Sequence, residues 1–187
     1  MKKLLLHTCC APCGSYISYE RLAPRFDLTW YFYNPNLVSA EEYDRRLEAV
    51  LKVTSRFGWA LVTEPYEHND WQTMTCGRGS DPERGPRCQL CYSERLAKTA
   101  RFAQTKGFDL FGTTLLVSPY KDTIAINKMG QALSNRLGVD FLSEDFQADD
   151  GYRHSQNMAK ELGLYRQRFC GCEYSLSPQL AARILKK

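Results

Sequence analysis

Seven of the eight cysteines in this 187-residue chain fall into three tight groups, and this feature constrains the fold more than any other. The groups are Cys9, Cys10 and Cys13; Cys88 and Cys91; and Cys170 and Cys172, while Cys76 stands alone. Many cysteines in a secreted chain indicate disulfides. Here the opening apolar stretch is only three leucines long before His7, which is too short for an export signal. Close groups from distant parts of such a chain instead indicate a metal or redox centre.

Strand and helix signals alternate along the chain, which is typical of an α/β fold. We expect strands at 3–7, 28–33, 59–63, 110–113 and 141–142, and helices at 12–22, 39–58, 86–107 and 122–138, with two more helices flanking 165–175. The second helix has the clearest start, because Ser39 and Glu42 form a Ser-x-x-Glu capping box. This order predicts one three-layer, Rossmann-like domain over 1–187, with a mostly parallel sheet of about five strands and extra C-terminal helices.

Cysteine and polar side chains follow two of these strands at the point where each strand ends. Cys9 and Cys10 follow the first strand, and Thr113-Thr114 and the segment 118–121 follow the fourth. Ligands of open parallel sheets bind beyond the carboxyl ends of the strands, near the point where the strand order reverses. We therefore expect these segments to face one crevice.

The spacing within the first two groups favours metal binding. Cys88 and Cys91 are three residues apart at a helix start, so both sulfurs share one face, and the helix N-terminus stabilises thiolates. Cys10 and Cys13 repeat this spacing more loosely. Cys9 and Cys10 point to opposite sides of an extended backbone, which favours two irons of one cluster, or two separate metals, over a single zinc. A buried apolar cysteine beside one ligand is the alternative.

The C-terminal pair, Cys170 and Cys172, favours electron transfer. A disulfide across Cys-Gly-Cys closes a small strained ring, and strain makes a disulfide easier to reduce. The competing role of this pair is to supply metal ligands. Cys76 is interpreted as a core or incidental thiol, and Cys13 either as a ligand or as a thiol near the site.

Basic residues concentrate toward the C-terminus, although the net charge of the chain is only +4. The segment from about 153 to 187 contains seven Lys or Arg residues and two Asp or Glu residues. A face of this kind suits phosphate contacts, and a solvated tail is the alternative.

Six strings spread over nearly the whole chain resemble, in order, the epoxyqueuosine reductase family called QueH. They are LLLHTCCAPCG, YFYNPNLVSAEEYDRR, RGPRCQLCYSERLAKTA, FGTTLLVSPYKD, FLSEDFQ and LGLYRQRFCGCEYS. The resemblance implies a cytoplasmic enzyme that converts epoxyqueuosine to queuosine at the tRNA wobble position, by two-electron reduction of the epoxide with loss of water. It also implies a fold like the adenine-nucleotide α-hydrolases, an iron–sulfur cluster, an electron donor, and neither cobalamin nor a membrane.

The same motifs imply roles for six of the cysteines. A 4Fe–4S cluster would be held by Cys9, Cys10, Cys88 and Cys91, and Cys170 and Cys172 would form the redox-active pair. Alternatively, one or more of the six would bind an additional iron beside the cluster.

Proton donors and tRNA contacts complete the expected site. The candidate proton donors are Tyr120, Lys121, His7 and Asp145, although His7 is alternatively a hydrogen-bonded residue at a strand end. The expected substrate-binding residues are Tyr120, Lys121, Arg153, Arg166 and Arg168, with phosphate contact as an equal role for Lys121 and Arg166. Unpaired bases stack on aromatic rings. The candidates for stacking are Tyr31, Tyr33, Tyr92, Tyr120 and Tyr165. For each of them, a place in the hydrophobic core is the alternative.

Two other classes of function compete with this interpretation. A zinc-stapled RNA-binding module needs four ligands, and more than four clustered cysteines argue against it. A tRNA sulfur-transfer enzyme of the same broad fold would carry a Ser-Gly-Gly-x-Asp-Ser loop for ATP after the first strand. This chain has Thr-Cys-Cys-Ala-Pro-Cys there, so use of ATP is disfavoured.

Overall fold

A computed structural model describes residues 1–184 of the protein, so Lys186 and Lys187 of the basic segment lie outside the described residues. Its centre is a five-stranded sheet in the order β3-β2-β1-β4-β5, in which every neighbouring pair is parallel. The strands are β1 (Lys2–His7), β2 (Phe26–Phe32), β3 (Ala60–Thr63), β4 (Leu110–Thr113) and β5 (Asp140–Phe141). The central strand β1 buries three consecutive leucines, as a strand covered on both faces does.

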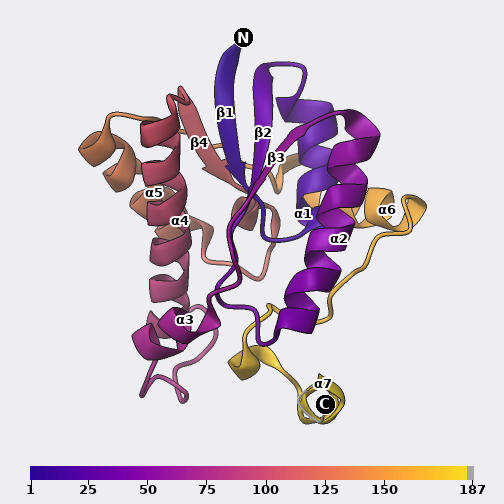
Figure 1. The fold of residues 1–187 in the computed structure, drawn as a ribbon, viewed down its shortest axis with the longest axis vertical. Coiled ribbons are helices and arrows are strands. Elements are labelled where there is room, and N and C mark those ends of the chain that lie inside the picture. The colour runs from indigo at the N-terminus through magenta and orange to yellow at the C-terminus, as the bar shows by residue number, and fades with distance from the viewer. Residues whose placement is uncertain (185–187) are drawn as a thin grey trace.

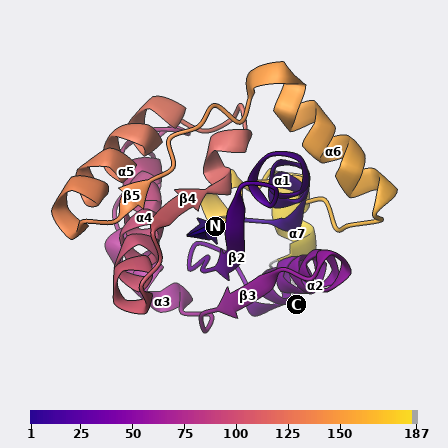
Figure 2. The same cartoon turned by 90° about the horizontal axis from the view of Figure 1, so that it is seen from above.

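Helices cover both faces of the sheet (Figures 1 and 2). One face carries α1 (Ala11–Tyr16), α2 (Ala40–Phe57) and α6 (Gly151–Glu161), and the other carries α4 (Pro86–Lys106) and α5 (Thr123–Leu137). Two short helices, α3 (His68–Met74) and α7 (Pro178–Ile184), lie beyond the lower ends of the strands in Figure 1. The predicted three-layer α/β fold is therefore confirmed. No helix among the described residues is long and apolar enough to cross a membrane.

Local differences from the predicted elements have physical causes. The helix predicted at 12–22 is one α-helical turn and a half followed by a π-helical segment, Ile17–Leu22. The capping box is only half formed: the Ser39 hydroxyl accepts the Glu42 amide at 3.2 Å, but the Glu42 carboxylate accepts from Arg46 at 2.7 Å. Helix α3 was not predicted, because its seven residues have no repeat of apolar positions.

The strand order reverses between β1 and β4, so the carboxyl ends of these two strands lie side by side. His7 is in register with Thr113, and the Cys9 amide donates to the Thr114 hydroxyl at 3.0 Å. The C-terminal segment passes below these strand ends, between α2 and α3 (Figure 1). Cys9 and the segment after β4 therefore lie together at the carboxyl edge, as expected, with the C-terminal segment passing below them.

Candidate metal and redox site

The three N-terminal cysteines form one compact group of sulfur atoms. The Sγ atoms of Cys9, Cys10 and Cys13 all lie within 4.8 Å of one another, and those of Cys9 and Cys10 are 3.8 Å apart. The expectation that Cys9 and Cys10 point to opposite sides is wrong, because β1 ends at His7 and the chain turns directly into α1. Cys13 thus lies with the other two sulfurs.

Hydrogen bonds within this group favour one thiolate. The Cys10 and Cys13 thiols hold the pKa of Cys9 well below the usual range for a thiol, and the Thr114 hydroxyl donates to its sulfur at 3.2 Å. The hydrogen bonds with Cys10 and then with Cys9 raise the pKa of Cys13. A thiolate is the form of cysteine that binds metal, so the group is already disposed to bind a thiophilic ion.

Cys88 and Cys91 lie on the first turns of α4, as predicted. Cys91 is buried and packs with Cys172 and with the indole of Trp71, which comes from α3. Burial raises the pKa of Cys91, against the opposing effects of Arg95 and of the Trp71 indole. Trp71 therefore brings the second and third cysteine groups together.

The backbone of Gly171 shapes the third group. Its φ of 132° lies in a region that favours glycine, and a Cβ there would stand 2.6 Å from Cδ2 of Leu37. The Val38 amide donates to the Gly171 carbonyl at 2.9 Å. The Cys-Gly-Cys loop can therefore approach the segment after β2 more closely than any other residue at this position would allow.

A buried ion pair on α2 also holds this loop. The Arg46 guanidinium donates to the Cys170 carbonyl at 3.1 Å and to the Glu42 carboxylate at 2.7 Å, and both side chains of this pair are 2% exposed. The other carboxylate oxygen of Glu42 accepts from the Tyr165 hydroxyl at 2.8 Å. Buried charges are tolerated when they are paired and fully hydrogen-bonded, and here the pair fixes the position of Cys170.

The two sulfurs of the third group have opposite acidities. The Lys121 ammonium donates to Cys170 Sγ at 2.9 Å. Burial would raise the pKa of Cys170, but Lys121 and Arg95 outweigh it and lower the pKa below the usual value. Burial and then Cys170 raise the pKa of Cys172 to about 11. Cys170 is thus the more acidic and more nucleophilic sulfur of the pair, and Cys172 is the protonated one at neutral pH.

Arg95 of α4 links the three groups electrostatically. Its guanidinium is 2% exposed and donates to Cys91 Sγ at 3.2 Å, and no described carboxylate lies within ion-pair distance. Burial would lower the pKa of Arg95, but Cys91, Cys170 and Cys9 outweigh it and raise the pKa. A buried cation without a carboxylate needs another anion, and the cysteine sulfurs of all three groups supply it.

The expected proton donors occupy different environments. His7 is fully buried and hydrogen-bonded, with Nε2 donating to the Tyr33 carbonyl at 3.0 Å and Nδ1 2.9 Å from the Thr113 hydroxyl. Burial lowers its pKa to about 4, so His7 is neutral and has no free N–H, as its alternative role required. Asp145 is exposed and accepts two backbone amides in its own loop.

The candidates for base stacking separate by exposure. Tyr31, Tyr33 and Tyr92 are buried, so the stacking role expected of these three is wrong and the core role holds. Tyr165 is half-buried against the core, and its hydroxyl donates to Glu42, so its stacking role stays a prediction. Tyr120 remains: it is 59% exposed, and its ring meets that of Tyr152 edge-on at 6.1 Å between centroids.

The remaining basic and thiol candidates lie at the surface. Arg166 and Arg168 are exposed, as is Arg153, which pairs with Asp150 at 2.6 Å. Cys76 is also exposed, which excludes a core role and leaves the incidental one.

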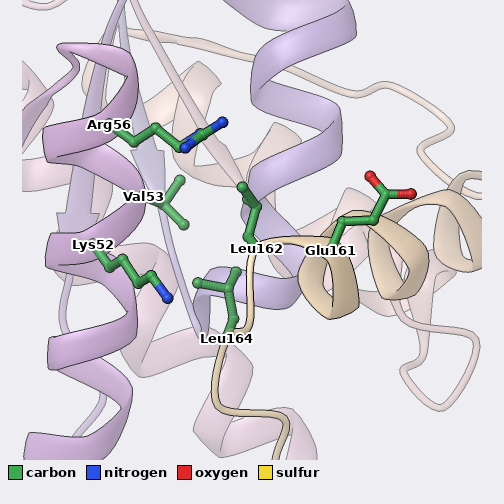
Figure 3. Close-up of a pocket in the computed structure, with 6 residues that line it drawn as sticks. All are labelled: Lys52, Val53, Arg56, Glu161, Leu162 and Leu164. Atoms are coloured by element: carbon green, nitrogen blue, oxygen red, sulfur yellow. The ribbon is translucent and has the colours of Figure 1, made fainter.

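A cavity lies apart from the cysteine groups (Figure 3). It has a volume of about 260 Å³ and is lined by the C-terminal half of α2 and by residues at the end of α6. Lys52 and Arg56 point toward it in the close-up, but no cysteine lines it. Helix α2 starts at the carboxyl edge of the sheet, so this cavity is at the far end from the sulfurs.

Sequence reasoning missed three residues that shape the site: Arg46, Arg95 and Trp71. The first two lie inside the recognisable strings, but a surface ion pair is the ordinary interpretation of an arginine on a helix. Only the three-dimensional structure shows that both arginines are buried against cysteines. Trp71 gave no signal, because its helix was not expected.

Comparisons with known proteins agree on a family. The family model described as "Epoxyqueuosine reductase QueH" matches residues 4–178. A protein of that name from Streptococcus pyogenes serotype M1 is 36% identical over 182 residues, covering 94% of this chain and 71% of the relative. Another from Thermotoga maritima is also 36% identical over 182 residues, covering 94% of this chain and 91% of the relative.

A solved structure shares the fold. The U34-tRNA thiolase NcsA from Methanococcus maripaludis, solved with its [4Fe-4S] cluster, matches with a TM-score of 0.56 and 14% identity. The match covers 94% of this chain and 62% of that one. At this identity the likeness supports the α/β fold alone.

Proposed function

Since the chain belongs to the epoxyqueuosine reductase QueH family, we propose that it reduces epoxyqueuosine in tRNA to queuosine. The observation that carries this proposal is the convergence of three cysteine groups around the buried Arg95 at the carboxyl edge of the sheet. The proposal includes a cytoplasmic enzyme that acts as one domain over 1–187, with the basic segment from about 153 as part of its tRNA face.

The residues present fit a thiolate-bound iron–sulfur cofactor. Sulfur donors suit iron–sulfur clusters, and a buried guanidinium without a carboxylate fits a centre of net negative charge. We assign Cys9, Cys10, Cys88 and Cys91 as ligands of a 4Fe–4S cluster, which would pass electrons one at a time. Cys13, within 4.8 Å of Cys9 and Cys10, is available for an additional iron, and cobalamin is not required.

Cys170 and Cys172 provide the two-electron chemistry. Conversion of an epoxide to an alkene consumes two electrons and two protons and releases water, and oxidation of two thiols to a disulfide supplies both. The lowered pKa of Cys170 and the raised pKa of Cys172 suit one nucleophilic and one proton-carrying sulfur. An external electron donor then supplies two electrons, and with two protons the disulfide returns to two thiols.

Anaerobically prepared protein should therefore be brown, with broad absorption near ~400 nm, as thiolate-bound iron–sulfur clusters are. Iron and sulfide analysis, with liquid chromatography of nucleosides from treated tRNA, measures both parts of the proposal. Removal of iron by a chelator should abolish conversion, and reconstitution should restore it. A colourless protein that holds only zinc and converts the substrate at full rate would contradict the cofactor assignment.

Exposed side chains beside the site suit an anticodon loop. Tyr120 offers a ring for an unpaired base, and Arg153, Arg166 and Arg168 offer charge to phosphates. Lys121 is half-buried against Cys170, so it would contact the substrate inside the site. Binding to tRNA should weaken as salt rises, because each phosphate contact releases counterions.

A plot of log affinity against log salt concentration has a negative slope. The triple change Arg153→Ala, Arg166→Ala and Arg168→Ala should make this slope shallower by about 2–3. The matched control removes the same charge at the opposite edge of the sheet, by Lys2→Ala, Lys106→Ala and Arg136→Ala, and should leave the slope nearly unchanged. Fluorescence anisotropy with labelled tRNA measures both. Equal slopes for the two variants would show that tRNA binds to another face of the protein.

A further inference from the structure

The hydroxyl of Tyr92 is a buried polar group with nothing to bond. Tyr92 lies on α4 and is 1% exposed, and its hydroxyl has no hydrogen-bond partner among the described residues. Nearly all buried hydroxyls in folded proteins are hydrogen-bonded, so each exception requires an explanation. A hydroxyl of this kind can form a hydrogen bond with a ligand atom.

The ammonium of Lys121 is a second donor with spare capacity. An ammonium offers three N–H groups. Among the described residues, the Lys121 ammonium bonds only to Cys170 Sγ, at 2.9 Å, and no carboxylate lies within ion-pair distance of it. Lys121 reaches the site from the loop after β4, at the carboxyl edge of the sheet. Two of its N–H groups are therefore free to bind a ligand.

The Lys121 ammonium contacts the Cys170 sulfur directly, at 2.9 Å, and the Tyr92 hydroxyl lies within electrostatic range of both. Burial raises the pKa of Tyr92 to about 12, and Lys121, Cys88 and Cys170 are all close enough to affect it. Burial would lower the pKa of Lys121, but Cys170, with Tyr92 adding to it, raises the pKa above the usual value. A nucleophilic sulfur is thus bonded to a fixed positive charge, with an unpartnered hydroxyl within electrostatic range of the pair.

We propose that the Lys121 ammonium, with the Tyr92 hydroxyl as a second donor, forms the subsite for the epoxide oxygen while Cys170 attacks the adjacent carbon. This inference rests on the proposed function and adds the group that receives the oxygen. Donors aimed at an oxygen where charge develops are among the most effective catalytic devices.

The atoms and electrons balance within the chain. The Cys170 sulfur forms a bond to carbon as the carbon–oxygen bond breaks, and the ammonium of Lys121 gives the oxygen its first proton. The Cys172 sulfur then attacks Cys170, so that a disulfide forms, the carbon–sulfur bond breaks and its electron pair becomes the alkene. The hydroxyl leaves as water with the proton of the Cys172 thiol. Two thiols and an epoxide become a disulfide, an alkene and water.

A ratio of two alkylation rates tests the subsite. Cyclopentene oxide and iodoacetamide both alkylate Cys170, which mass mapping follows, but only the epoxide develops charge on an oxygen. Relative to the full-length wild type, the rate with epoxide divided by the rate with iodoacetamide should fall about 100-fold in Lys121→Met and about tenfold in Tyr92→Phe. The exposed residues Lys128 and Tyr19 give matched controls, Lys128→Met and Tyr19→Phe, which should keep the ratio.

A second readout separates this role from a structural one. Tyr92→Phe removes a hydroxyl that has no partner, so its melting temperature should not fall, whereas single turnover of epoxyqueuosine tRNA should slow by about the same tenfold. If wild type converts the substrate but Lys121→Met or Tyr92→Phe keeps the ratio within twofold, the subsite is wrong. If wild type itself converts no substrate, the proposed function fails instead.

Discussion

Cys172→Ser protein is expected to keep its iron–sulfur absorption and to lose multiple turnover by about 10³-fold or more. The sulfur of Cys172 is 7% exposed and close to both Cys170 and Cys91, and its raised pKa marks it as the protonated partner of the pair. Without it, the bond between Cys170 and the substrate has no thiol to resolve it. Denaturing gels of the reduced variant with labelled tRNA should show a covalent adduct on Cys170.

Thiol mapping of the wild-type protein gives the result with which the Cys172→Ser variant is compared. In wild type, anaerobic alkylation should label both sulfurs before turnover and neither after one turnover without an external donor. Loss of iron from Cys172→Ser in proportion to the loss of activity would make Cys172 a metal ligand and would end the dithiol mechanism.

Cys91→Ser should lose both iron and activity by at least about tenfold, because its sulfur is assigned as a cluster ligand. The change also weakens the contact by which the buried guanidinium of Arg95 is satisfied, since a serine hydroxyl is neutral whereas a metal-bound cysteine sulfur would carry negative charge. Anaerobic iron analysis and the nucleoside assay measure the two losses on the same sample.

The chain contains its own control for this experiment. Cys76 is exposed and stands apart from the three groups, so Cys76→Ser should keep both iron and activity near wild type. If Cys76→Ser lost its iron while Cys91→Ser retained it, the grouping of the cysteines would be wrong.

The fold could be predicted well because its signals are local. The leucines of β1, the Ser39 cap of α2 and the glycine after α5 each act on the nearest residues, and alternation of strand and helix then leaves few arrangements. The prediction failed where a long-range contact overrides a local one. Glu42 is such a case, because its carboxylate accepts from Tyr165 of the C-terminal segment, and from Arg46, instead of capping its own helix.

The site could be predicted only by residue type. The sequence indicated which cysteines belong together, since each group lies within five residues. It could not show that the sulfur atoms of Cys9, Cys10 and Cys13 converge, because that depends on how sharply the chain leaves β1. It also could not show that Arg95 is buried without a carboxylate, because an arginine on a helix is usually at the surface.

The likeness to a tRNA thiolase bears on the competing interpretations. A sulfur-transfer enzyme was a rival on the same broad fold, so the shared fold does not separate the two functions. The family match over residues 4–178 does separate them.

The buried contact between Arg46 and the Cys170 carbonyl joins residues 124 positions apart, and it sets an order of events during synthesis. The three N-terminal sulfurs emerge from the ribosome together and can meet early. The second group cannot acquire its neighbour Cys172 until nearly the whole chain has been translated, about ten seconds or more after Cys9 at ordinary rates of elongation. The four cysteines assigned as cluster ligands have all been translated by residue 91, so iron can be bound before Cys170 and Cys172 exist, and the redox pair joins the centre last.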